Sequence, residues 1–280
     1  MWNYLIPPTL LIGDFTRSRN THVWPGGVRA TAKEFKDKPH RIVVIGGSFT
    51  FGSAIANEDT FAWKLQEAFP DYQVLNFETG AYGSYQSLLL LEEYFASPHP
   101  ADLVLYGYIN HHQNRNVATA TWMHSIEKYS TKWNHVYIPY CTLDERGELI
   151  RHTPERHPRF PLREQLCLSA LAERFYIELI TKKRTAQRRT ITKKIIQEMK
   201  ELSTSHGAKS ACILLDSVES SSTERTDILN LMRETGSEYI DCIVSPRPEL
   251  ALYDGHPNEM RNAQYAKCII KAIVENHVLN

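Results

Sequence analysis

The sequence predicts an α/β protein in which a mostly parallel, five-stranded sheet lies between two layers of helices. Two observations lead to this class. Short runs rich in β-branched residues alternate with stretches of helical periodicity, and strands separated by helices usually pair in parallel through right-handed crossovers. The 280 residues also suit one domain with an insertion better than two separate cores. We therefore expect a single three-layer α/β/α sandwich.

The first predicted strand is Arg41-Ile42-Val43-Val44-Ile45, which ends at Gly46-Gly47 as a buried parallel strand should. The other predicted strands cover residues 73–77, 102–108, 211–215 and 239–244. Helical spacing predicts helices over 60–69, with Asp59 as the N-cap, and over 85–95, 227–233 and 258–274. Two more helices are expected between about 162 and 202.

Two segments depart from this alternation. Residues 1–40 are expected to form an N-terminal arm that wraps the domain, which itself covers 41–280. The stretch 141–163 is Pro-rich and polar without a clear period, which predicts an irregular insertion over one end of the sheet and a candidate lid. With the helices that follow, the insertion extends to about residue 205.

A group of basic residues lies within this insertion. It comprises Lys182, Lys183, Arg184, Arg188, Arg189, Lys193 and Lys194. We interpret the group as a solvated helix face, because no aromatic residues are interleaved with it to stack on bases. Over the whole chain 32 basic residues balance 32 acidic ones. No global field then holds the protein on nucleic acid or an anionic bilayer, so we expect a small or neutral partner.

The five cysteines are odd in number, scattered, and without metal-ligand spacing. They are Cys141, Cys167, Cys212, Cys242 and Cys268. We predict structural thiols, with no disulfide framework. The apolar start, Met1 to Gly13, lacks the basic region and cleavage site of a signal peptide and is too short to span a bilayer. The expected location is cytoplasmic, or periplasmic or membrane-associated if the native N-terminus is longer.

Ser48 lies in the loop Gly46-Gly47-Ser48-Phe49-Thr50-Phe51-Gly52, after the first predicted strand. Chemistry in such sheets gathers beyond the carboxyl ends of the strands. Glycines permit a tight turn that brings a side chain into a cleft, and nearby N–H groups can face an oxyanion. The alternatives are a plain turn or a phosphate-binding loop, although neither the P-loop spacing nor GxGxxG is present.

An acid and a histidine, Asp254 and His256, stand in a short loop before the final helix. This spacing lets the carboxylate orient the imidazole, which can then take a proton from a serine hydroxyl. Hydrogen-bond donors follow the second and third predicted strands, in 76–86 and 106–116. The adjacent His111 and His112 point apart on an extended chain and have no carboxylate at ligand spacing, so we predict no metal site and no cofactor.

In chain order, these four blocks resemble those of the SGNH/GDSL hydrolase family, over residues 41–274. The resemblance implies a flavodoxin-like SGNH fold with Ser48 as nucleophile, His256 as base and Asp254 as acid. It also implies an oxyanion hole formed by the N–H groups of Ser48 and Ala81 and by Asn110. Alternative donors are Gly80, Gly83, Asn114 and Asn116.

The sequence departs from the family pattern at several positions. Gly47 stands where many members carry Asp, and Ala81 stands at the position of the oxyanion-hole glycine. Ala81 fits there if its φ is negative or only mildly strained. Asn110 is followed by His111 instead of Asp, and the Asp-x-His spacing is one residue shorter than in many relatives.

The resemblance implies a serine esterase that cleaves an ester, for example a small acyl group on a carbohydrate or lipid. The alternatives are an acyltransferase to a sugar or lipid hydroxyl, an inactive binding protein with the same fold, and a nucleotide-binding α/β protein. Six aromatic residues near the candidate site suit sugar stacking, an acyl pocket or simple packing, and packing is expected for most. They are Phe49, Phe51, Tyr82, Tyr85, Tyr108 and Tyr253.

Overall fold

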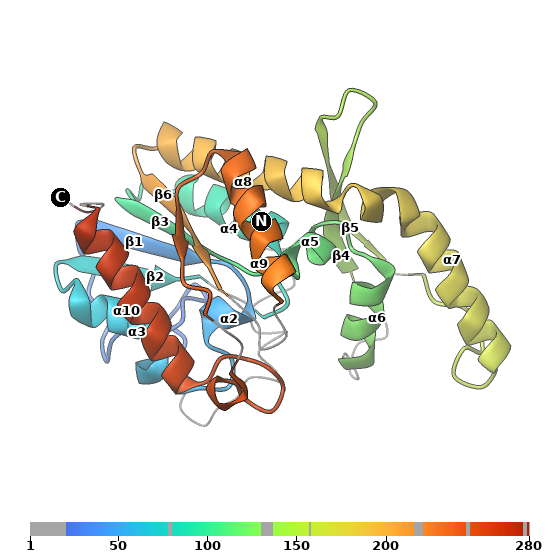
Figure 1. Cartoon of the computed structure of the whole chain (residues 1–280), viewed down its shortest axis with the longest axis horizontal. Coiled ribbons are helices and arrows are strands. Elements are labelled where there is room, and N and C mark those ends of the chain that lie inside the picture. The colour runs from blue at the N-terminus through green and yellow to red at the C-terminus, as the bar shows by residue number, and fades with distance from the viewer. Residues whose placement is uncertain are drawn as a thin grey trace.

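The computed structural model describes residues 21–77, 80–129, 137–156, 158–215, 221–244, 247–276 and 279. Its central sheet consists of β1 (His40–Ile45), β2 (Tyr72–Asn76), β3 (Leu103–Tyr108), β6 (Lys209–Leu214) and β7 (Tyr239–Asp241). All neighbouring strands pair in parallel, in the order β2-β1-β3-β6-β7. This is the flavodoxin-like arrangement, in which the strand order reverses next to β1. The predicted fold class is therefore confirmed (Figure 1).

Helices cover both faces of the sheet. One face packs against α3 (Phe61–Ala68) and α10 (Glu259–Glu275), and the other against α4 (Ser84–Phe95), α8 (Arg188–Ser205) and α9 (Ser222–Thr235). In β1, Ile42 and Val44 enter the first core while Val43 and Ile45 enter the second. Because successive side chains of a strand point to opposite faces, a continuous apolar run satisfies both layers.

The five predicted strands all form, with ends shifted by a few residues. The predicted helices also form, and the two expected between 162 and 202 are α7 (Cys167–Ala186) and α8, which meet at Gln187. The predicted N-cap of α3 was wrong. Thr60 caps the helix by accepting a hydrogen bond from Trp63 N, whereas Asp59 ends a short 3-10 turn, η2 (Asn57–Asp59).

The expected irregular insertion at 141–163 is largely a β-hairpin, so that expectation was wrong. β4 (Tyr137–Leu143) and β5 (Leu149–Arg156) pair antiparallel around a turn in which Asp144 Oδ1 accepts from Arg146 N and Glu148 N. Pro139 falls at an irregularity in the pairing, and such interruptions hide the alternation by which strands are recognised. The hairpin packs on α4, α5 (His112–Asn116) and α8.

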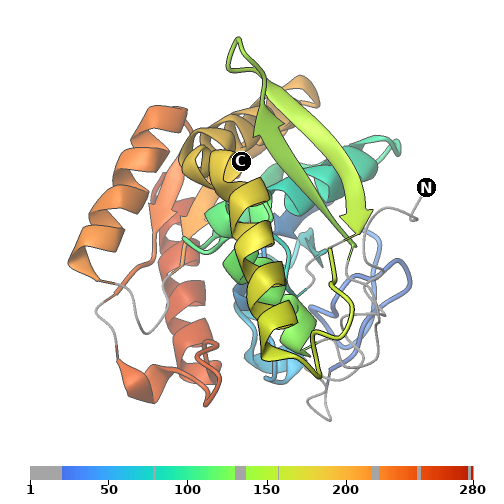
Figure 2. The ribbon, with the colours of Figure 1, turned by 90° about the vertical axis from the view of Figure 1, so that its right-hand side faces the viewer.

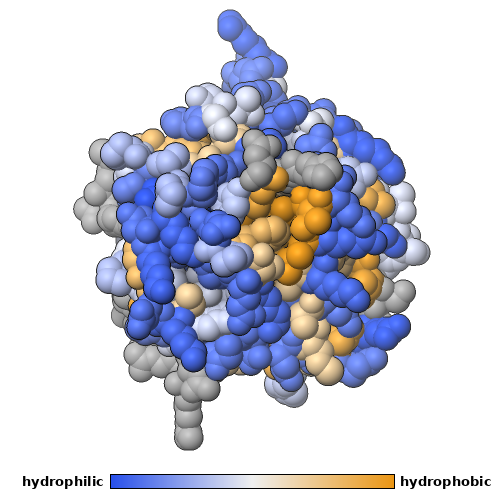
Figure 3. All heavy atoms as spheres, turned by 90° about the vertical axis from the view of Figure 1, so that its left-hand side faces the viewer, coloured by the Kyte–Doolittle hydropathy of each residue, from blue (hydrophilic) through white to orange (hydrophobic). Residues whose placement is uncertain are grey.

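The hairpin and α7 stand at one end of the molecule, together with α6 (Ala120–Tyr129) (Figures 1 and 2). On the opposite side, the surface is mostly hydrophilic, and its broadest apolar area lies near the centre of the view (Figure 3). Among the helices of the described residues, none is both long enough and apolar enough to cross a membrane.

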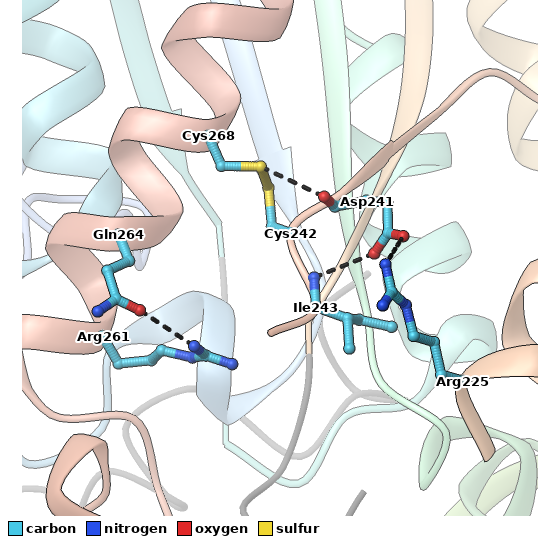
Figure 4. The surroundings of a disulfide bond; sticks show 7 residues. All are labelled: Arg225, Asp241, Cys242, Ile243, Arg261, Gln264 and Cys268. Carbon is cyan, nitrogen blue, oxygen red and sulfur yellow. Dashed lines mark hydrogen bonds and ion pairs between the residues drawn. A yellow bond between two sulfur atoms is a disulfide. The ribbon is translucent and has the colours of Figure 1, made fainter. Parts of the chain in front are cut away.

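The absence of disulfides was a wrong prediction for one cysteine pair. Cys242, just after the edge strand β7, is bonded to Cys268 on α10 (Figure 4). Their Cα atoms lie 5.9 Å apart although the residues are separated by 26 positions. Cys141 and Cys212 are buried free thiols, and Cys167 is an exposed one. Burial raises the pKa of the Cys212 thiol to about 12, so it stays protonated.

Candidate active site

A tight turn between β1 and α2 (Ser48–Phe51) presents Ser48 at the carboxyl end of the sheet. Gly46 makes this turn possible. A Cβ at Gly46 would lie 2.4 Å from Thr50 Oγ1 and 2.6 Å from the carbonyl oxygen of Gly107. The N–H groups of Thr50 and Phe51 donate to the carbonyl oxygen of Gly47, which closes the turn. Ser48 follows as the first residue of α2 and is 6% exposed.

The base stands on a second tight loop, just before α10. Gly255 takes a left-handed φ of 83°, and Leu252 N donates to the carbonyl oxygen of His256 at 2.7 Å. Asn258 closes the loop. Its side chain accepts from Arg261 N to cap α10 and donates to the carbonyl oxygen of Glu249. The loop is therefore fixed to the start of a long helix.

These two loops bring the predicted nucleophile, base and acid together. The Nε2 of His256 lies 2.9 Å from Ser48 Oγ, and its Nδ1 lies 2.9 Å from Asp254 Oδ2. The other oxygen of Asp254 accepts a hydrogen bond from His256 N. The ring of Phe49 packs beside the imidazole at a centroid distance of 5.5 Å. The arrangement lets the imidazole accept a proton from Ser48 on one side while a carboxylate contacts it on the other.

Arg29, which the sequence did not single out, fixes the far end of the nucleophile turn. Its buried guanidinium donates to the carbonyl oxygens of Phe51, Gly52 and Ile55 and to Asn57. Desolvation lowers the pKa of Arg29 to about 10, which still leaves it charged at neutral pH. No motif marks an arginine of this kind, because its partners are backbone carbonyls that only the fold gathers.

Ala81, the predicted oxyanion donor, has a left-handed φ of 71°. This conformation costs a residue with a Cβ about 1 kcal/mol or more and is the one that glycine adopts freely. The condition of a negative φ is therefore not met, and Ala81 carries this modest backbone strain instead. Within the described part of the chain, no protein group accepts a hydrogen bond from the N–H of Ser48 or Ala81.

Two alternative donors are occupied in the structure. The N–H of Gly83 donates to Gln86 Oε1 in the cap of α4. The buried amide of Asn116 donates to Ser84 Oγ and Thr192 Oγ1 and accepts from Tyr85 N. Both groups therefore serve packing of the helices.

The other predicted donors lie at the carboxyl edge of the sheet. Asn110 lies after β3 and is half-buried. Its Oδ1 accepts a hydrogen bond from Gln113 Nε2, and its amide nitrogen is the group that can donate to an oxyanion. Gly80 precedes Ala81 in the loop after β2. Asn114 lies on α5, where its N–H donates to the carbonyl oxygen of His111.

Gly47 has no room for a side chain, because other side chains occupy the space beside it. A Cβ on Gly47 would lie 2.6 Å from His112 Nε2 and 3.1 Å from Arg115 Nη1. His112 is fully buried and its Nδ1 lies 2.7 Å from the hydroxyl of Tyr106. Arg115 donates to the carbonyl oxygen of Tyr82 at 2.7 Å and packs over Trp122. The Arg115 guanidinium therefore connects the loop of Ala81 with the nucleophile turn beside Gly47.

Most of the aromatic residues near the site are packing residues, as expected. Five of them are at most 7% exposed, namely Phe49, Phe51, Tyr82, Tyr85 and Tyr108. Tyr253, next to Asp254, is instead fully exposed. His111 is exposed while its neighbour His112 is buried, so the two imidazoles face different surroundings.

No protein-family model and no curated protein sequence matches the chain. Solved structures do match. TesA is 11% identical, with a TM-score of 0.51, covering 85% of this chain and 99% of that one. A member of the lipolytic protein G-D-S-L family from Veillonella parvula is 10% identical, with a TM-score of 0.49, covering 84% and 98%. A catalytic mutant of the acetylxylan esterase Axe2 from Geobacillus stearothermophilus is 11% identical, with a TM-score of 0.47, covering 84% and 94%.

The chain therefore shares its α/β fold with TesA, in agreement with the fold class that the sequence predicted. At such low identity, the likeness establishes the shared fold alone. The roles of individual residues rest on the geometry of the site.

Proposed function

We propose that this protein is a serine esterase that hydrolyses esters through an acyl-enzyme. The observation that carries the proposal is the contact of Ser48 Oγ with His256 Nε2 at 2.9 Å, backed by Asp254 at 2.9 Å from Nδ1. His256 takes the Ser48 proton as Oγ attacks the acyl carbon. The imidazolium then protonates the departing alcohol, and in the second half-reaction water releases the acid.

The developing oxyanion would be held by the N–H groups of Ser48 and Ala81 and by the amide of Asn110. All three follow strands that end at the same edge of the sheet. Each such donor contributes about 3 kcal/mol to transition-state stabilisation.

The substrate class that the site suits is a small acyl ester on a carbohydrate or lipid alcohol. Tyr253 supports this class, because its exposed aromatic ring, in the same short loop as Asp254 and His256, offers a stacking surface to a sugar or an apolar alcohol. Transfer to another hydroxyl uses the same acyl-enzyme. Release of free acid in the absence of an alcohol acceptor therefore separates hydrolysis from transfer.

The experiment is labelling of the purified protein with a fluorophosphonate probe, together with turnover of p-nitrophenyl acetate. We expect Ser48→Ala to lose both signals. Ser53→Ala is the matched control, because Ser53 is also buried in the nucleophile turn region but does not contact His256. Circular dichroism checks that both variants fold. Full activity of Ser48→Ala would overturn the proposal, as would a wild-type protein that neither reacts with the probe nor cleaves the ester.

A further inference from the structure

α7 exposes an unusually apolar surface. Six of its large side chains are between 42% and 78% exposed, namely Leu168, Leu171, Phe175, Tyr176, Leu179 and Ile180. Single exposed apolar residues are common on proteins, but a contiguous group marks an interaction surface. The helix is also the outermost element at its end of the molecule (Figures 1 and 2).

These side chains form a continuous face that points away from the body. Leu168, Leu171, Phe175 and Leu179 follow one another at spacings of three and four residues, which places them on one side of a helix. The buried residues of α7 lie on the other side. Glu173, Ile177 and Thr181 are at most 5% exposed, and Glu173 pairs with Arg163. The outward apolar face therefore contributes nothing to the core.

The charges around this face favour one kind of partner. Residues 158–187 carry six Lys or Arg side chains against three carboxylates, a net charge of +3, whereas the chain as a whole is neutral. Each of the three carboxylates pairs with an arginine of the same segment: Glu164 with Arg159, Glu173 with Arg163, and Glu178 with Arg174. The acidic charge here is thus neutralised locally.

Two exposed lysines remain at the end of the apolar face. Lys182 and Lys183 follow Leu179 by three and four residues, so their stems extend the same face. Long lysine side chains can lay their apolar stems along such a surface and carry the charge to its edge. An apolar helix face bordered by lysines matches the boundary between the acyl chains and the anionic headgroups of a bilayer.

We propose that α7 docks the protein onto anionic lipid bilayers, with the face of Leu168, Leu171, Phe175 and Leu179 in the interface and Lys182 and Lys183 at the headgroups. A second copy of the chain fits this surface less well, because two segments of charge +3 would face each other. A single acyl chain also fits less well, because ligand sites are concave whereas this face is the convex outside of a helix.

The test is co-sedimentation of the full chain with two kinds of vesicle: phosphatidylcholine mixed with phosphatidylglycerol, and phosphatidylcholine alone. We expect tighter binding to the mixed vesicles, and weaker binding when salt is raised from about 0.1 M to about 1 M. Lys182→Gln with Lys183→Gln should weaken that binding roughly 25-fold, since a lysine near an anionic surface contributes about fivefold. Leu168→Ser, Phe175→Ser and Leu179→Ser together should weaken it at least about tenfold.

The matched control is Met260→Ser with Val274→Ser, two exposed apolar residues of α10 on the other side of the molecule. This variant should bind the mixed vesicles like the wild type. Because all the substituted side chains are exposed, each variant should keep the wild-type melting temperature. The proposal fails if the wild type ignores mixed vesicles, or if the control loses binding while the α7 variant keeps it. It also fails if light scattering shows that the wild type is a dimer that does not bind vesicles, and that the α7 substitutions convert this dimer to monomers.

Discussion

His256 Nε2 lies 2.9 Å from Ser48 Oγ, although 208 positions separate the two residues in the chain. β1 delivers Ser48 through a turn that only glycine permits at Gly46, and the capped start of α10 delivers His256. Each side chain is held by backbone contacts of its own loop. The folds of the two loops therefore position both side chains of the pair.

Replacing Asp254 with Asn should lower kcat for p-nitrophenyl acetate about 10²-fold. The carboxylate contacts His256 at Nδ1 and at its backbone N–H, and the amide would keep the size but lose the charge that stabilises the imidazolium. Asp254 is half-exposed, so we expect a smaller loss than for His256→Ala. The exposed Asp71→Asn serves as the control. An unchanged kcat in Asp254→Asn would show that the base needs no acid.

Ala81→Gly should stabilise the protein by about 1 kcal/mol, because the left-handed φ of 71° strains a residue with a Cβ. Urea unfolding followed by circular dichroism measures the change. Ala56→Gly is the matched control, since Ala56 has a φ of −68° and glycine should lower stability there. Equal effects of the two substitutions would contradict the strain at Ala81.

The buried His112 should make stability fall below pH 6.5. Desolvation, with the charges of Arg115 and His111, holds the pKa of His112 well below its usual value of 6.5. Below pH 6.5 the imidazole of His112 therefore binds a proton in the unfolded chain but not in the folded one. The contribution of the neutral His112 to the free energy of unfolding is present above pH 6.5 and is lost as the pH falls. The slope of the free energy of unfolding against pH approaches about 1.4 kcal/mol per pH unit below pH 6.5.

The slope is measured by urea unfolding between pH 7.5 and 5.5. His112→Gln should remove this part of the pH dependence whatever it does to stability at pH 7.5. The exposed His99→Gln should leave the slope as it is. An identical slope in wild type and His112→Gln would rule out the buried neutral imidazole.

Removing the disulfide should cost about 3.5 kcal/mol, the loop entropy for a closure of this length. Cys242→Ala with Cys268→Ala should lower the urea midpoint, and a reducing agent should lower the wild type to the same value. Cys212→Ala removes a buried free thiol and should show no response to the reducing agent beyond that of the wild type. If reduction leaves the wild-type midpoint unchanged, the bond is not formed in solution.

This bond also bears on where the protein works. Disulfides persist in oxidising compartments and are rare in the cytosol. The bond between Cys242 and Cys268 is of the kind that persists in oxidising compartments.

Local patterns along the chain predict the layers of the fold and the order of the site residues. The run Ile42–Ile45 is apolar at every position, which is typical of a strand in a parallel sheet that helices cover on both faces. This pattern therefore predicted the α/β fold class. Ser48, Asp254 and His256 were found because glycine-rich loops and an Asp-x-His pair are local patterns. The hairpin was not recognised, because residues 138–141 of β4 are buried in succession and Pro139 falls at an irregularity in the pairing, so β4 shows no apolar-polar alternation.

The groups that support and surround the site come together only in the folded protein. Arg29, His112 and Arg115 act on backbone and side-chain atoms from distant segments, and a pattern along the chain holds no record of such contacts. The same is true of Cys242 and Cys268, whose pairing depends on β7 lying beside α10. The net charge of zero over the whole chain likewise did not indicate the positive segment at α7. A net charge sums over all residues, whereas the charge of a surface depends on the few side chains that the fold places next to one another.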